Sequence, residues 1–160
     1  IATGIDLELA WEGVHTPHKV KAAVNGCPRN CAEASTKDIG LIAVEGGWQI
    51  RIGGAAGARV REGDILATVS TKAEAMRLST VFLQHYRENA EYLERTYLYI
   101  ERVGLDHVKE AVLDDTSGEP VWTTRLDSAR GPTQLAISGA GSGEDFRTLA
   151  VATQTQPPLG

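Results

Sequence analysis

The hydrophobic pattern changes its period at Thr71, and this change constrains the fold more than any other feature. Before Thr71 the apolar residues form short, β-branched or alternating runs. The runs Ile39 to Val44, Trp48 to Ile52 and Asp64 to Val69 predict strands, and Gly46-Gly47 predicts a hairpin turn between the first two. After Thr71 the apolar residues recur at helical spacing. Strands followed by helices indicate an α+β fold.

A long helix is expected to begin at Thr71. Thr71 and Glu74 have the spacing of a capping box, and Gly104 ends the pattern. Asp106 is expected to cap a further short helix that ends at Leu113. The long helix would carry one apolar stripe over about seven turns. The stripe consists of Met76, Leu83, Ala90 and Tyr97, with Tyr86, Leu93 and Ile100 beside them.

Composition excludes several classes of protein. The chain has 160 residues, with 16 Lys and Arg against 21 Asp and Glu and a net charge of −5, which argues against a nucleic-acid-coating or anionic-membrane-binding protein. No apolar run reaches the roughly 18 residues of a membrane span, and no signal peptide is recognisable. Two cysteines are too few for a disulfide scaffold, so the sequence predicts a soluble protein of a reducing compartment, the cytoplasm. Because the amphipathic run Ile1 to Trp11 opens the chain directly, we expect it to begin inside a longer polypeptide.

The last third of the chain differs in composition. Four of the six prolines and many Gly, Ser and Thr residues follow Asp114. A poorly ordered tail is the simplest interpretation, and the alternative is a weak hairpin that pairs Leu135 to Ser138 with Phe146 to Thr153. The glycines Gly139, Gly141 and Gly143 do not predict a phosphate loop, because no Gly-Lys-Ser/Thr ending follows them.

The two cysteines, Cys27 and Cys31, are four residues apart in the segment NGCPRNC, and Pro28 is at an expected first helical position. A helical turn would place both thiols on one side, where they could bind one metal centre. Three interpretations remain open: unliganded thiols or a disulfide, a zinc site completed by His15 and His18, or an iron–sulfur cluster. A cluster needs four thiolates, so two would come from outside this chain.

Positive charge gathers around the cysteines. Between His15 and Lys37 the basic residues outnumber the single acidic residue, Glu33, in a chain that is acidic overall. A local anion site is one interpretation, and a solvated basic surface is the other. The basic residues are Lys19, Lys21, Arg29 and Lys37.

The segment from His15 to Gly54, HTPHKVKAAVNGCPRNCAEASTKDIGLIAVEGGWQIRIGG, resembles the sirohaem and iron–sulfur domain of assimilatory nitrite and sulfite reductases. That family has a C-x5-C pair followed by a C-x3-C pair, and Cys27 and Cys31 match the second pair. The Cys-Ala-Glu-Ala at Cys31, the YLERT at Tyr92 and the IERVGL at Ile100 resemble the NAD(P)H-dependent nitrite reductase large subunits. The resemblance covers about Ile1 to Leu113.

The resemblance implies a site. Cys27 and Cys31 would be ligands of a [4Fe-4S] cluster, and Cys31 would also be the axial ligand of the sirohaem iron. Arg29 and Asn30 would contact the cofactors, and the basic residues would bind cofactor or attract nitrite. Gly53 and Gly54 would let the backbone approach the macrocycle, unless they serve only as a turn at a strand end. No residue of this chain is identified as catalytic.

The resemblance also implies the fold and the function. The fold would be the second half of the cluster and sirohaem domain, with a mixed sheet and a long C-terminal helix. The enzyme would reduce nitrite to ammonium with six electrons from NAD(P)H, through FAD in the upstream part, the cluster and sirohaem. A small Rieske-like subunit is a possible partner, whereas nucleic acid and membrane are not expected.

The chain is expected to have three parts, and two other functions remain open. The parts are 1–70 in the cluster and sirohaem domain, 71–113 as a helical extension packed on it, and 114–160 as the tail. One alternative function is a sulfite reductase haem domain, and the other is a zinc-stabilised or cofactor-free helical binding module. As an isolated fragment the chain is expected to be inactive.

Overall fold

A four-stranded mixed sheet forms the centre of the structure. The computed structural model describes residues 1–114, 135–137 and 149–151, and the strand order is β1-β2-β3-β6. β1 and β2 are parallel, whereas the other neighbours are antiparallel. The predicted hairpin is confirmed, with Gly46 at a positive φ of 78°, and so is the α+β class with a mixed sheet. The strands are β1 (Ala22–Asn25), β2 (Ile39–Val44), β3 (Gly47–Ile52) and β6 (Asp64–Val69).

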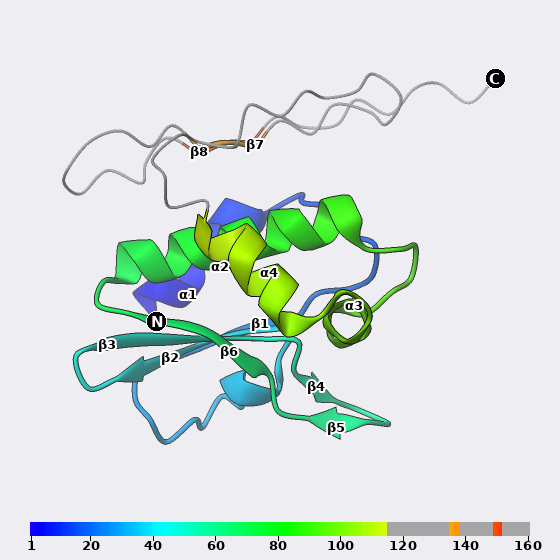
Figure 1. Cartoon of the computed structure of the whole chain (residues 1–160). Helices are drawn as coiled ribbons and strands as arrows, with labels where there is room; N and C mark the ends of the chain where they lie inside the picture. The colour runs from blue at the N-terminus through cyan, green and yellow to red at the C-terminus, as the bar shows by residue number, and fades with distance from the viewer. Residues whose placement is uncertain (115–134, 138–148, 152–160) are drawn as a thin grey trace.

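Helices cover one face of this sheet. In Figure 1 α1 (Ala2–Trp11), α2 (Lys72–Asn89) and α4 (Leu105–Leu113) lie above the sheet, and α3 (Thr96–Val103) lies at one end. The side chains that β2 and β3 direct to this face come from two opposed pairs, Ile39 with Ile52 and Leu41 with Ile50, and all four are fully buried. Their burial, together with that of the helix residues, is the main favourable term in folding. The helices contribute Leu7, Leu78, Phe82, Tyr86, Tyr99, Val108 and Val112 to this core.

The opposite face of the sheet is covered by the short 3-10 helix η1 (Ala34–Thr36). Gly40 in β2 allows this contact, because a Cβ at Gly40 would lie 2.0 Å from the carbonyl oxygen of Ala34. The Asp38 carbonyl also accepts a hydrogen bond of 2.9 Å from the Gly53 amide, at the end of β3. In Figure 1 the segment that precedes η1, which contains both cysteines, lies on the face of the sheet away from the helices.

The prediction of one continuous helix from Thr71 to Gly104 is wrong, because two helices, α2 and α3, replace it. α2 ends at Asn89, and Ala90 has extended backbone angles. The chain then turns, with Leu93 at a φ of 64° and its amide donating to the Pro17 carbonyl at 3.0 Å. The apolar spacing continues through this turn, but Leu93 is 59% exposed. Contacts of the next residues with Asp38, described below, impose the break in the helix.

The two predicted helix caps have different outcomes. The Thr71 hydroxyl accepts a hydrogen bond of 3.2 Å from the Glu74 amide, so the helix start is confirmed. The Asp106 cap is wrong, because α4 begins at Leu105 after Gly104, and no side chain caps it. Gly104 has a φ of 92° and is the single residue between α3 and α4. α4 packs against the core through Val108 and Val112, which are fully buried.

A small hairpin extends from the sheet. β4 (Ala55–Ala56) pairs with β5 (Val60–Arg61). The Arg59 side chain in its turn donates to both carboxylate oxygens of Glu101, at 3.2 and 2.7 Å, and lies over the Tyr97 ring at 5.2 Å. The hairpin is thereby tied to α3.

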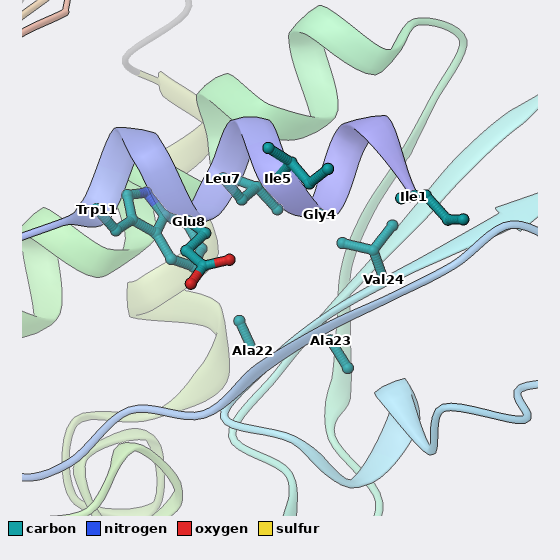
Figure 2. Close-up of a pocket in the computed structure, with 9 residues that line it drawn as sticks. All are labelled: Ile1, Gly4, Ile5, Leu7, Glu8, Trp11, Ala22, Ala23 and Val24. Carbon is teal, nitrogen blue, oxygen red and sulfur yellow. The ribbon is translucent and has the colours of Figure 1, made fainter.

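α1 and β1 enclose an apolar groove of about 480 Å³, shown in Figure 2. Leu7 and Trp11 reach into it from the helix, and Ala22 and Val24 line it from the strand. β1 is an edge strand of the sheet.

A further strand pair lies late in the chain. β7 (Leu135–Ile137) and β8 (Leu149–Val151) pair antiparallel, in agreement with the hairpin alternative. The rest of the expected tail, with Gly139, Gly141 and Gly143, lies outside the described residues.

Candidate functional site

Both cysteines lie in the segment that joins β1 to η1. The segment makes turns at residues 28–29 and 31–32, so the helical turn expected to begin at Pro28 is wrong. Cys27 and Cys31 are both free and exposed. Their thiols are accessible to a metal centre, and the disulfide interpretation is not supported.

Three polar side chains fix the shape of this cysteine loop. The Asn25 amide group donates to the Asn30 side-chain oxygen at 2.8 Å, and the Asn30 amide group donates to the Ser35 hydroxyl at 2.6 Å. The Ala32 backbone amide donates to the Asn25 side-chain oxygen at 2.9 Å. Asn30 has a φ of 56°, a left-handed conformation that asparagine tolerates better than most residues. Asn30, which directly precedes Cys31, therefore stabilises the loop through hydrogen bonds to both of its ends.

The donor set fits part of an iron–sulfur site. Thiolates are the ligands of such clusters, and two of the four needed are present here. In the described part of the chain, no group of three or more His, Cys, Asp and Glu side chains is placed to hold a metal ion. His15 and His18 thus do not complete a zinc site with the cysteines, and that interpretation is wrong for the described residues.

Three of the four basic residues singled out from the sequence line a cavity of about 320 Å³. Lys19 and Lys21 lie before β1, and Lys37 follows η1. Arg59 and Arg95 line the same cavity, but sequence reasoning missed them because they come from distant parts of the chain. Arg29 does not line this cavity: it is exposed in the cysteine loop.

Asp38 is the one carboxylate of the cavity, and it is 1% exposed. Both of its oxygens accept hydrogen bonds from Arg95 Nη2 at 3.0 Å. It also accepts from the Lys21 amide at 3.0 Å and from the Thr96 hydroxyl at 2.5 Å. Buried charges are retained when paired and hydrogen-bonded in this way. Asp38 therefore joins β1, β2 and α3, and its contacts explain why the chain leaves α2 before Arg95.

Comparison with known proteins identifies the domain. Residues 3–120 match the nitrite and sulphite reductase 4Fe-4S domain family. The chain belongs to this family. It is 51% identical over 115 residues to the nitrite reductase [NAD(P)H] of Bacillus subtilis, covering 72% of this chain and 14% of that protein. It is 36% identical over 120 residues to the nitrite reductase (NADH) large subunit of Escherichia coli, covering 74% and 14%. An assimilatory-type sulfite reductase of Nitratidesulfovibrio vulgaris is 34% identical over 113 residues, covering 71% and 52%. The chain thus spans about one seventh of the nitrite reductases that it matches.

Two glycines of this 4Fe-4S domain pack against the chain itself. Gly53 has a φ of 70°, and a Cβ there would lie 2.6 Å from Ile100 Cδ1. A Cβ at Gly54 would lie 2.5 Å from the carbonyl oxygen of Lys37. The interpretation of Gly53 and Gly54 as a turn at a strand end is supported. The backbone at these glycines closely approaches Ile100 and Lys37 of the same chain.

A cluster of aromatic and titratable side chains lies between α2, α3 and α4 of the domain. The His85 Nε2 and the Tyr99 hydroxyl are 2.7 Å apart, and the His107 ring lies 6.0 Å from the His85 ring. Burial lowers the pKa of His85 below 6.5, and the neighbouring His107 lowers it further. Burial also raises the pKa of Tyr99 and raises that of Tyr86 to about 12.

No helix in the described part of the chain has both the length and the hydropathy of a bilayer span.

Proposed function

We propose that the full-length protein containing this chain is an assimilatory nitrite reductase that reduces nitrite to ammonium. Six electrons would come from NAD(P)H through FAD, a [4Fe-4S] cluster and sirohaem. The observation that carries this proposal is the accessible thiol pair in a fixed loop of a 4Fe-4S domain. The nitrite reductases among its relatives support nitrite as the substrate.

Within that enzyme, Cys27 and Cys31 would bind the cluster, and Cys31 would also bind the sirohaem iron. Asn30 would act as a positioning residue, because its side chain already binds Asn25 and Ser35. Arg29 is exposed in the same loop, where its guanidinium is available for a cofactor carboxylate. When bound, the cluster and sirohaem would supply the electron transfer, while these residues hold and orient them.

The described residues supply only two of the four thiolates. The other two would come from a part of the protein outside this chain. We therefore expect the isolated chain to hold no complete cluster and to have no nitrite reductase activity.

Sulfite reduction is the second candidate, supported by the similarity to an assimilatory-type sulfite reductase. The two candidates share the same cofactors, so binding of cofactors does not separate them. Turnover of nitrite and sulfite by the same preparation, compared as kcat/KM, does.

The remaining expectations are part of the proposal. Residues 1–70 would belong to the cluster and sirohaem domain, 71–113 to its helical extension and 114–160 to a tail. A small Rieske-like subunit remains a possible partner. The free thiols support a reducing compartment, which we propose to be the cytoplasm.

The proposal is tested with Cys27→Ser and Cys31→Ser in the full-length protein. Both variants should lose cluster iron, and Cys31→Ser should also lose the sirohaem absorption bands. Lys109→Gln, on α4, is the matched control and should keep both cofactors and nitrite-dependent oxidation of NAD(P)H. Full iron content and activity in both cysteine variants would contradict the proposal.

A further inference from the structure

We propose that Asn25 is a site of spontaneous deamidation, and that the hydrogen bonds of the cysteine loop control the rate of this reaction. The chain contains three asparagines, Asn25, Asn30 and Asn89, and only Asn25 is followed by a glycine. Glycine has no side chain to shield its backbone nitrogen, and it has the widest choice of backbone angles. The Gly26 nitrogen can therefore reach the Asn25 side chain more easily than the nitrogen of a residue with a side chain could.

The reaction consumes only water. The Gly26 backbone nitrogen loses its proton and attacks Cγ of Asn25. A bond forms between these two atoms while the bond from Cγ to Nδ2 breaks, and ammonia leaves with the proton. Water then opens the cyclic imide at one of its carbonyl groups. Opening at the side-chain carbonyl gives aspartate, and opening at the backbone carbonyl gives isoaspartate, in which the backbone runs through the former side chain.

The closed cysteine loop fixes the Asn25 side chain. Asn25 is the last residue of β1 and is 6% exposed. Its Oδ1 accepts a hydrogen bond from the Ala32 amide at 2.9 Å, and its Nδ2 donates to Asn30 Oδ1 at 2.8 Å. The side chain loses these bonds when Cγ moves onto the Gly26 nitrogen, and unpaired polar atoms are costly at a buried position. The closed loop should therefore slow deamidation, and local opening of the loop should permit it.

The hydrogen bonds of Asn30 extend this control to the far end of the loop. The Asn30 side chain donates to the Ser35 hydroxyl at 2.6 Å and accepts from the Ser35 amide at 3.3 Å. Asn25 is thus held by a residue that is itself fixed at the start of η1. Loss of the contacts of either Asn30 or Ser35 should expose Asn25 to the reaction.

Deamidation would weaken the closed loop in turn. An aspartate has no Nδ2 donor, so its carboxylate would face the Asn30 oxygen without a proton between them. An isoaspartate adds one carbon to the backbone between β1 and Cys27, and this displaces Cys27 relative to the sheet. In the full-length protein the displacement should release cluster iron, a consequence that rests on the proposed function.

Gly26 offers a matched control. Its φ is not in the left-handed region, and apart from its chain neighbours a Cβ at this position would meet no atom of the described residues within 4 Å. Gly26→Ala should therefore keep the fold of the loop. The added methyl group should nevertheless hinder attack by the nitrogen of residue 26.

The test follows deamidation in the full-length protein by peptide mapping and mass spectrometry during incubation at mildly alkaline pH. A synthetic peptide of residues 21–30 gives the rate without the folded loop. The unchanged protein should deamidate at Asn25 about tenfold more slowly than the peptide, or slower still. Asn30→Ala should approach the rate of the peptide. Ser35→Ala removes one hydrogen bond of Asn30 and should react about fivefold faster than the unchanged protein, which keeps the test valid if Asn30→Ala unfolds the domain.

Three comparisons separate the loop from other causes. Gly26→Ala, added to Asn30→Ala, should slow the reaction several-fold. Asn89, which is exposed and precedes an alanine, is the internal control and should stay unmodified. Cys31→Ser keeps the hydrogen bonds of Asn25, so it should deamidate far more slowly than Asn30→Ala even where cofactors are lost. The readout is a mass change and does not depend on nitrite reduction.

The outcomes that would overturn the inference are equally specific. Equal rates in the peptide and the unchanged protein would show that the loop gives no protection. Rates in Asn30→Ala and Ser35→Ala equal to that of the unchanged protein would remove the role of the hydrogen bonds. A rate in Cys31→Ser equal to that in Asn30→Ala would assign the control to the cofactors.

Discussion

Asn30 should be the residue on which the shape of the cysteine loop depends most. Its side chain makes three hydrogen bonds: with the Asn25 amide group at 2.8 Å, the Ser35 hydroxyl at 2.6 Å and the Ser35 amide at 3.3 Å. Each is worth about 1 kcal/mol net, and alanine at a φ of 56° adds strain of about 1 kcal/mol. Asn30→Ala should therefore destabilise the loop locally by about 4 kcal/mol.

Hydrogen exchange measures this local cost. The Ser35 amide donates to Asn30, so its exchange should become nearly a thousandfold faster, by about three factors of ten, in Asn30→Ala, since about 1.4 kcal/mol corresponds to a factor of ten. Amides in β2 and α2 should change much less. In the full-length protein the same variant should lose cluster iron.

Asn30→Asp is the matched control. The carboxylate keeps the acceptor for Asn25 and for the Ser35 amide, and the Ser35 hydroxyl can donate in place of accepting. Exchange at Ser35 should then stay within about tenfold of the unchanged protein, which corresponds to the loss of about one hydrogen bond. Equal protection of Ser35 in Asn30→Ala and the unchanged protein would refute the role assigned to Asn30.

Three further predictions concern the scaffold. Asp38→Asn leaves the partly buried Arg95 unpaired and should cost about 3 kcal/mol of unfolding free energy, measured by urea denaturation; an unchanged midpoint would be inconsistent with the buried ion pair. Gly40→Ala should cost about 2 kcal/mol in the same assay, because its Cβ would lie 2.0 Å from the Ala34 carbonyl oxygen. The pKa of His85 is lower in the folded protein, so the His85 imidazole of the unfolded chain binds a proton at a higher pH. His85 should therefore not reduce the free energy of unfolding above pH 6.5, and should reduce it as the pH falls through the folded pKa. His85→Gln should make the free energy of unfolding less dependent on pH in this range, as measured by urea denaturation at several pH values. An unchanged pH dependence would contradict the role assigned to His85.

Local patterns in the sequence predicted the sheet well. The β-branched run at Ile39 and the glycines at the turn were enough to place β2 and β3, because burial of alternate residues and turn chemistry are both local signals. The Thr71 cap is local in the same sense. The cysteine pair was likewise recognisable from its spacing and flanking residues.

Features that depend on distant contacts could not be predicted in this way. The apolar stripe continues past Ala90, but the chain leaves the helix where Leu93 contacts Pro17 and where Arg95 and Thr96 contact Asp38, 57 and 58 residues away. The turns at the cysteines follow from the contacts of Asn30, which override the helical preference at Pro28. The sequence indicated only the three lysines of the basic cavity. Arg59 and Arg95 are distant from them in the sequence and lie beside them only in the folded chain.

The central claim is that Cys27 and Cys31 belong to a cluster and sirohaem centre. It is tested most directly by an anaerobic absorption spectrum with iron and zinc analysis of the full-length protein. We expect sirohaem bands and about five irons per chain, four in the cluster and one in the haem. A colourless protein with about one zinc, or with no metal, would contradict the claim and leave the cysteine loop with a structural role.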